Sequence, residues 1–173
     1  MRFVGLLRGV NVGGVRFAMA DLRAALQEAG FADVRTVLAS GNVLATADDD
    51  ATGAARRVRT VVLERFGFDV GVVAVGLETV RAAVAAHPFP VDADRHAYVV
   101  FATDPADLRA LADGFEGEGD DERVATGDGV LHWEVAKGRT LDSAFGRRLA
   151  RGARAGTVTT RNRNTLEKIL AAG

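Results

Sequence analysis

The stretch VRTVLASGNVLATA, residues 34–47, decides the predicted fold. Its two arms, residues 34–39 and 43–47, are rich in apolar and β-branched side chains, as is typical of strands. The residues between them, Ser40-Gly41-Asn42, tolerate positive φ and are typical of a tight turn. The stretch therefore predicts two antiparallel strands joined by a short turn.

The elements around this hairpin complete a β-α-β-β-α-β order. The apolar run at residues 2–7 predicts a strand, and apolar residues at helical spacing predict helices over 19–29 and 51–66. A valine-rich run at 69–75 predicts a further strand. This is the order of elements in a ferredoxin-like unit, in which the spatial order of the strands is 4-1-3-2.

The same order begins again in the second half of the chain. Asp104-Pro105 is typical of a helix N-cap followed by proline at the first helical position. Gly127-Asp128-Gly129 predicts the turn of a second hairpin. The other predicted elements are strands over 97–102, 123–126, 130–135 and 157–159, and helices over 141–149 and up to about residue 170.

We therefore predict an α+β protein made of two successive ferredoxin-like βαββαβ halves, a duplication with a connecting helix and an extra C-terminal helix. The predicted domains are residues 1–76 for the first half, 77–94 for the connecting helix and loop, and 95–173 for the second half with the C-terminal helix. A single mixed, doubly wound sheet is the main alternative.

Composition excludes several classes of protein. The chain has 173 residues, of which 48% are hydrophobic and 26% charged, and it has no cysteine. These values are typical of a soluble globular protein and exclude a disordered chain and a disulfide scaffold. The first eight residues hold too few apolar side chains for a signal peptide or a membrane span. We expect a cytoplasmic protein with no membrane partner.

The sequence gives little support for a metal site, a nucleophilic serine or an aromatic RNA-binding surface. His87, His96 and His132 are dispersed in the sequence, so no metal site is predicted, and no cofactor is indicated. Ser40 and Ser143 stand outside any nucleophile motif. Tyr98 and Phe101 alternate on one predicted strand, so at most one of them shares a face with Trp133, and core packing is favoured over base stacking. The sequence does not decide whether the protein is an enzyme.

One candidate site follows from the predicted topology. In a ferredoxin-like sheet the loop that leaves the first strand and the turn between the second and third strands emerge at the same end. Glycine backbone, an arginine fork and the start of a helix would meet there, and each of these favours an anion. The candidate ligand-binding residues are Arg8, Asn11, Gly13 and Gly14 from the loop with Ser40, Gly41 and Asn42 from the turn.

These residues also have a purely structural interpretation. In this interpretation the glycines only shape the turns, and the side chains of Asn11 and Asn42 form hydrogen bonds within their own loops. Arg8 forms an ion pair with an acidic side chain. The loop lacks the lysine and hydroxyl residue of a Walker motif, and its glycine spacing is not that of a dinucleotide-binding loop. The sequence leaves both interpretations open.

A second candidate segment lies near the C-terminal end, where Thr160, Arg161 and Asn162 precede the last predicted helix. Asn162 or Asn164 is suited to cap that helix. The arginines need another reason, because the positive end of a helix dipole disfavours cations unless an anion lies there. A bound phosphate, a nucleic-acid backbone or the protein's own acidic stretch, residues 113–122, would supply that anion.

Charge is distributed unevenly along the chain. The formal net charge is −1, yet residues 77–138 carry a net −8 and residues 139–173 a net +6. The leading hypothesis is a binding protein for a phosphate-bearing ligand, either a nucleotide or nucleic acid. The alternatives are an enzyme that acts on a small anionic substrate at the same corner, and an interaction module that forms a homo-oligomer through its acidic and basic segments.

Four segments carry a family resemblance: LLRGVNVGG at 6–14, MADLRAAL at 19–26, residues 30–43, and TTRNRNT at 159–165. Together they resemble a bacterial family known only as domain of unknown function 1697. The resemblance supports the fold and the importance of these segments, and it implies no reaction, substrate or cofactor. The chain departs from that family's usual pattern at Val15-Arg16-Phe17, where a lysine-bearing segment is usual, and at Arg163, where tryptophan is usual.

Overall fold

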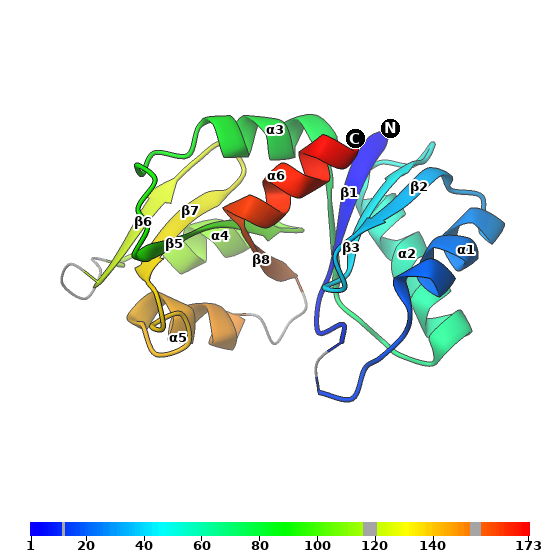
Figure 1. Ribbon diagram of the computed structural model, residues 1–173, viewed down its shortest axis with the longest axis horizontal. Helices are drawn as coiled ribbons and strands as arrows, with labels where there is room; N and C mark the ends of the chain where they lie inside the picture. Colours follow the sequence, from blue (N-terminus) through cyan, green and yellow to red (C-terminus); the bar gives the residue numbers. More distant parts are fainter. Residues whose placement is uncertain (12, 116–120, 153–156) are drawn as a thin grey trace. The chain divides into compact units, whose positions relative to one another are not determined.

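The structure is a computed structural model that describes residues 1–11, 13–115, 121–152 and 157–173. Within these ranges the chain forms six α-helices and two four-stranded antiparallel sheets, so the protein is α+β as predicted (Figure 1). The chain divides into two compact units. The first comprises Met1–Val80 and Glu167–Gly173, and the second comprises Arg81–Leu166.

The sheet of the first unit has the strand order β2-β3-β1-β4, and all its neighbours are antiparallel. Its strands are β1 (Arg2–Leu7), β2 (Ala32–Val37), β3 (Asn42–Thr46) and β4 (Val72–Gly76). The hairpin predicted from residues 34–47 is therefore confirmed as β2 and β3. A register irregularity between Ala32 and Arg35 interrupts the ladder near the start of β2.

Two helices, α1 (Met19–Glu28) and α2 (Ala51–Phe66), pack on one face of this sheet. The core between them contains Phe3 and Leu7 from β1, Leu22 from α1 and Val58 from α2. The observed bounds of α2 agree with the helix predicted over 51–66, because a capping residue precedes the helix and a glycine follows it. The Asp50 carboxylate accepts a hydrogen bond from the Gly53 N–H (2.7 Å), and Gly67 ends the helix with φ +74°.

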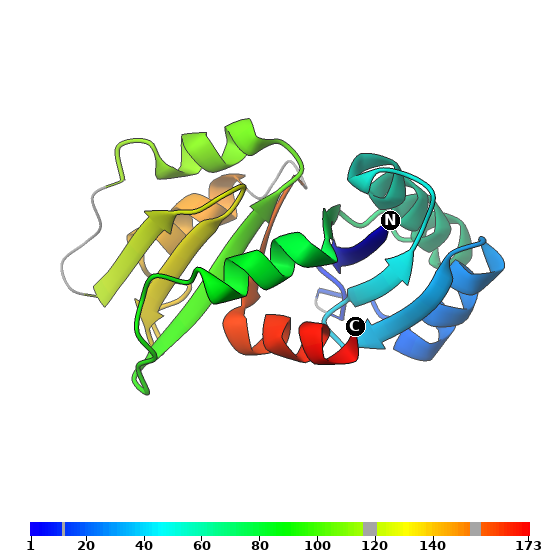
Figure 2. The ribbon, with the colours of Figure 1, turned by 90° about the horizontal axis from the view of Figure 1, so that it is seen from above.

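The second unit repeats the same sheet order as β6-β7-β5-β8. Its strands are β5 (Arg95–Ala102), β6 (Glu122–Thr126), β7 (Leu131–Ala136) and β8 (Val158–Asn162). The helices α4 (Pro105–Ala112) and α5 (Ala144–Gly152) pack on one face of the sheet; in Figure 2, α4 lies above the strands and α5 lies behind them. Asp104 caps α4 by accepting from the Ala106 N–H (2.8 Å), as predicted.

The Trp133 side chain lies in the core of this unit. Trp133 is 1% exposed and stacks on Tyr98, its cross-strand neighbour, with ring centroids 4.9 Å apart. The Trp133 indole N–H and the Phe145 N–H both donate to the buried carboxylate of Glu122, at 3.2 and 3.1 Å. Core packing, rather than base stacking on an open sheet, therefore accounts for Trp133.

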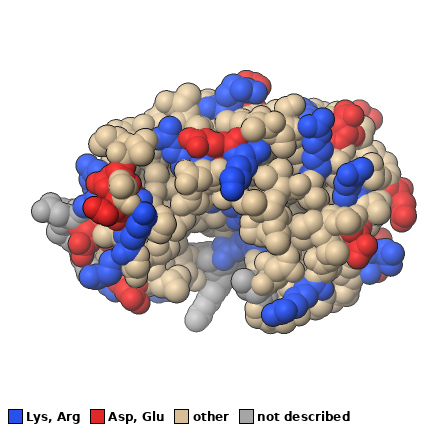
Figure 3. Space-filling model, viewed as in Figure 1, with Lys and Arg blue, Asp and Glu red and all other residues tan. Residues whose placement is uncertain are grey.

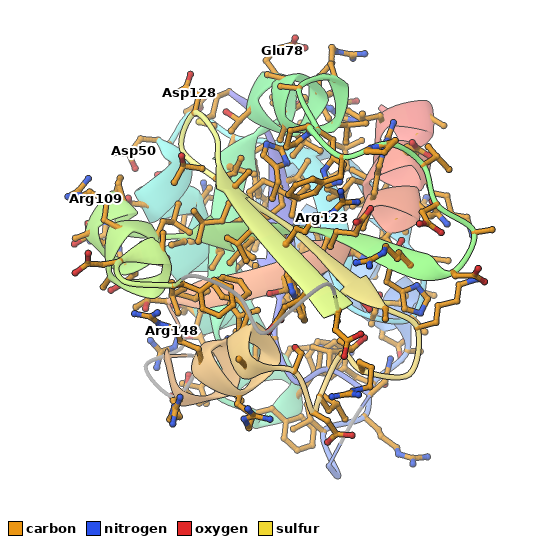
Figure 4. All side chains as sticks on the ribbon, turned by 90° about the vertical axis from the view of Figure 1, so that its left-hand side faces the viewer. Asp50, Glu78, Arg109, Arg123, Asp128 and Arg148 are labelled. Carbon is orange, nitrogen blue, oxygen red and sulfur yellow. The ribbon has the colours of Figure 1, made fainter. Side chains whose placement is uncertain are left out.

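Arg148 ties the two helices of the second unit together. It extends from α5 (Figure 4) and donates to the carbonyls of Ala110 (3.1 Å) and Asp113 at the C-terminal end of α4. A cation at that position also opposes the negative end of the α4 dipole. Part of the basic C-terminal segment therefore has a structural role inside its own unit.

Among the boundaries that differ from the sequence prediction, two have a plain physical reason. The strand expected at 157–159 continues to Asn162, because Thr160, Arg161 and Asn162 pair with β5 and so satisfy their backbone groups. The helix expected from residue 141 begins at Ala144, because the Asp142 and Ser143 N–H groups bond to the Arg139 carbonyl in a turn.

The helices α3 (Leu77–Ala85) and α6 (Arg163–Ala172) each contain a boundary between the two units. The end of α6 belongs to the first unit, whereas the sequence places the whole C-terminal helix with the second half. Gly173 lies against Leu44 and Leu77, and Arg35 donates to the Ala172 carbonyl. No helix among the described residues is both long enough and apolar enough to cross a membrane.

Candidate functional site

The loop after β1 and the turn between β2 and β3 lie side by side in the first unit. The Leu7 N–H donates to the Gly41 carbonyl (2.8 Å), and the Asn11 side-chain amide donates to the Ala39 carbonyl. We call residues 8–16 the Gly loop, residues 38–41 the hairpin turn, and both together the loop–turn corner. The neighbouring positions predicted for these two segments are thus present in the structure.

The Gly loop has an unusual backbone. Gly9, Asn11, Gly13 and Gly14 all have positive φ, and the Asn11 N–H closes the loop by donating to the Val15 carbonyl (2.8 Å). A Cβ added at Gly9, Gly13 or Gly14 would meet no atom within 4 Å. Glycine is therefore required there for conformation and not for space, and the backbone is open to an approaching ligand. Val12 lies outside the described residues.

Gly41 has a different role in the hairpin turn. Its φ is +76°, and a Cβ there would lie 2.9 Å from Leu7 Cβ and 3.2 Å from Val10 Cβ. The absence of a side chain thus lets the turn pack directly on the start of the Gly loop. Gly41 fixes the shape of the corner.

Asn42 is completely buried. Its side-chain amide donates to the Val37 carbonyl (2.8 Å) and to Ser40 Oγ (3.0 Å). These bonds hold the two ends of the hairpin turn, so the structural interpretation accounts for Asn42. We therefore give it the role of supporting Ser40 and not of contacting a ligand.

Ser40 and Arg8 are the polar side chains with the clearest chemistry at the corner. Ser40 is exposed, and because its oxygen accepts from Asn42, its hydroxyl proton can be donated outward. Arg8 is half-buried, and burial lowers the pKa of its guanidinium below the ordinary value. A partly desolvated cation gains more from a bound anion than a fully hydrated one does.

Leu38 is a feature of the corner that the sequence does not reveal. Its φ is +60° and its side chain is 45% exposed, although leucine rarely adopts this conformation. The Asn42 bond to Val37 and the Asn11 bond to Ala39 hold the residues on either side of it. The strain is therefore maintained by the two asparagine side chains.

The residues predicted from the C-terminal segment belong to the second unit, so the loop–turn corner is built from the first unit alone. Arg161 donates to Thr159 Oγ1 (2.8 Å) and to the Thr160 carbonyl (3.0 Å). Asn162 Oδ1 accepts from the Asn164 N–H (2.9 Å), which confirms that Asn162 caps the last helix. Thr160 pairs with Val100 in the β5–β8 ladder.

The remaining predictions concern charge and metal binding. In the acidic stretch, residues 116–120 lie outside the described residues. On the face shown in Figure 3, acidic and basic side chains are interspersed. Over the described part of the chain, no group of three or more His, Asp or Glu side chains is arranged to hold a metal ion.

Comparison with known proteins places the chain in a family. A model described as "Protein of unknown function (DUF1697)" matches residues 1–132, a segment that contains both parts of the loop–turn corner. Among solved structures, the chain is similar to a conserved bacterial protein from Streptococcus pneumoniae. The TM-score is 0.77 and the sequence identity 24%, with 99% of this chain and 97% of that chain covered. This likeness concerns the fold alone.

No curated protein sequence matches the chain. The family match nevertheless covers well over half of the residues and includes the Gly loop, the hairpin turn and α1. On this match, the chain belongs to the DUF1697 family of proteins of unknown function.

Proposed function

We propose that the protein binds a phosphate-bearing ligand, a nucleotide or a nucleic-acid backbone, at the loop–turn corner. The observation that carries this proposal is the pair of hydrogen bonds, Asn11 to Ala39 and Leu7 to Gly41, that fastens the Gly loop to the hairpin turn. They hold an open, positive-φ backbone next to Arg8 and the Ser40 hydroxyl. Such a preordered set of donors loses little entropy when it binds an anion.

The donors suit phosphate chemically. Backbone N–H groups in loops with positive φ can converge on one anion, and an arginine fork can bond two phosphate oxygens at once. The loop leads into α1, whose N-cap residue, Ala18, gives no side-chain cap to the first turn. The positive end of the α1 dipole adds to the positive electrostatic potential of these donors.

The composition of the corner favours binding over catalysis. Residues 8–16 and 38–42 contain no Asp, Glu or His. A general base for the alternative enzymatic function would have to come from another part of the chain or from the substrate. We therefore propose a binding function and keep the cytoplasmic location as part of that proposal.

We also propose that the two units arose as a duplication of one ferredoxin-like unit. In each unit a strand is followed by a helix, a hairpin, a second helix and a fourth strand, and the sheet orders β2-β3-β1-β4 and β6-β7-β5-β8 correspond position by position. The second unit has Asp104 and Asp128 in its equivalent loops. The proposed anion site therefore belongs to the first unit only.

Arg8→Ala is expected to weaken phosphate-ligand binding about 10- to 100-fold, because a hydrogen bond to a charged group contributes about 1.5–3 kcal/mol. For the unsubstituted protein, ADP at about ten times its Kd should stabilise the fold by about 1.4 kcal/mol and raise Tm by about 4 °C. Thermal shift and calorimetric titration with inorganic phosphate, ADP and a short single-stranded RNA give the affinities.

Arg23→Ala is the matched control, since Arg23 is an exposed arginine on α1 and its replacement should leave the affinity unchanged. A nucleic-acid ligand would show affinity that falls steeply with salt, whereas a nucleotide would show a shallow slope. If none of the three probes shifts Tm or gives heat of binding, the proposed function is wrong.

A further inference from the structure

Two histidines, 45 residues apart in the sequence, meet in the second unit. His132 lies in β7 and His87 in the segment after α3, and their Nδ1 atoms are 3.0 Å apart. The two rings are nearly perpendicular, at 81°. In such a contact one Nδ1 must donate and the other accept, so the accepting imidazole is neutral, and two neutral imidazoles in this contact hold opposite tautomers.

The pair is enclosed. His132 is 2% exposed, and Val99 and Ala125 are its cross-strand neighbours on the same side of the sheet. A Cβ added at Gly127 would lie 2.7 Å from His132 Nε2, so glycine is required for space at that position. His87 Nε2 is buried and has no hydrogen-bond partner among the described residues. The accepting ring cannot take up a proton at Nδ1 without losing this hydrogen bond, and a proton added at His87 Nε2 would put charge on a buried atom that has no acceptor among the described residues.

The surrounding charges favour the neutral pair. Burial and the cation of Arg163 on α6 lower the pKa of His87, and burial together with His87 lowers the pKa of His132 to about 4. From β8, Arg161 shares this side of the sheet, opposite Val99. The buried carboxylate of Glu134 on β7 could offset these cations, but it is already paired with Arg123.

The segment that carries His87 has a second contact with the sheet. The Phe89 ring lies edge-on to the His87 ring, with centroids 5.5 Å apart, and beneath the Arg123 guanidinium at 5.0 Å (Figure 4 labels Arg123). We call residues 87–91 the strap. The strap forms neither helix nor strand, and Val91 at its end is 88% exposed. The His87–His132 and Phe89–Arg123 contacts therefore hold it on the sheet.

We propose that the His87–His132 contact is a proton-operated clip, which holds the strap on the second sheet while both imidazoles are neutral and releases it when the pair takes up a proton. The added proton comes from solvent and stays on the imidazole pair, so no other group changes its charge. After release, both Nδ1 atoms of the protonated pair are available to water.

The direction of the pH dependence follows from proton counting. A released histidine has its ordinary pKa of 6.5, above the value of about 4 in the clipped state, so the released state binds more protons between these values. The clip is therefore fully effective above pH 6.5 and weakens as the pH falls towards 4. Because each pKa unit is a factor of ten, the equilibrium shifts by about 300-fold towards release in all, between pH values well above 6.5 and pH values well below 4.

NMR on the full-length chain tests the clip. At pH 7 the imidazole nitrogen shifts should show two neutral rings with opposite Nδ1 protonation, and the amide of Val91 should be ordered. Between pH 6.5 and 4.5 we expect the strap amides to become mobile, with the equilibrium shifted about 40-fold, while the signals of β5 and β7 persist. Loss of the β5 and β7 signals in the same step would overturn the proposal.

Variants separate a clip from a merely structural contact. In His87→Ala the pKa of His132 should rise towards 6.5 and the strap should be mobile at pH 7. In His132→Gln the strap should no longer respond to pH, and His96→Gln, the matched control at the third histidine, should behave as the unsubstituted protein does. If the strap stays ordered at pH 4 with both rings protonated, or if His132 titrates at the same pH with and without His87, the clip does not exist.

Discussion

Gly41→Ala is expected to destabilise the first unit by about 3 kcal/mol. Two costs contribute. The left-handed conformation, φ +76°, costs an alanine about 1 kcal/mol, and the new Cβ would lie 2.9 Å from Leu7 Cβ, which forces a shift costing about 1–3 kcal/mol more. Urea denaturation followed by circular dichroism gives the change in the free energy of unfolding.

Gly13→Ala is the matched control for Gly41→Ala. Gly13 has a similar positive φ, +59°, but a Cβ there meets no atom within 4 Å. Only the conformational cost of about 1 kcal/mol should remain. If the two variants lose the same amount of stability, the hairpin turn does not pack on the Gly loop as described. Gly41→Ala should also reduce phosphate binding, since the Leu7–Gly41 hydrogen bond would be displaced.

Trp133→Ala is expected to destabilise the second unit by about 4 kcal/mol, the usual range for loss of a buried large aromatic side chain being about 3–5 kcal/mol. Trp133 is in contact with Tyr98 and Phe145, and its indole N–H is one of the donors to the buried Glu122 carboxylate. Removing it leaves a cavity and deprives that carboxylate of a partner. Far-UV circular dichroism in urea measures the loss, because the variant retains no tryptophan for fluorescence.

Trp133→Phe separates the two contributions. Phenylalanine keeps most of the packing but cannot donate to Glu122, so the expected loss is about 1–3 kcal/mol, the cost of an incompletely satisfied buried acceptor. A loss below 1 kcal/mol for Trp133→Ala would contradict the placement of this side chain in the core. Equal losses for both variants would show that the hydrogen bond, rather than the packing, carries the effect.

Local sequence signals predicted much of the fold because capping residues and glycines act directly on the backbone groups at the ends of helices. Asp50 and Gly67 bound α2 by a cap and a left-handed residue, and Asp104 starts α4 in the same way. The length of β8 could not be predicted from such signals. Its polar residues, Thr160 to Asn162, become a strand only because β5 offers them a hydrogen-bonding edge.

The candidate corner was predictable in its location but not in the roles of its members. Chain topology placed the Gly loop beside the hairpin turn, and the Asn11 bond to Ala39 joins the two. Burial, however, is a tertiary property, so the sequence could not distinguish buried Asn42 from exposed Ser40. The strained Leu38 and the His87–His132 pair were missed for the same reason, since each depends on neighbours distant in the sequence.

The assignment of Glu167–Gly173 to the first unit has a consequence for biosynthesis. A ribosome that makes this chain polymerises Met1–Val80 early, but it adds the residues that lie against Leu44 and Leu77 only after it has translated all of Arg81–Leu166. Until the final turns of the last helix have been synthesised, the nascent N-terminal unit therefore exposes part of the apolar surface that they cover. A ribosomal pause before codon 167 would prolong this exposure and favour capture by a chaperone.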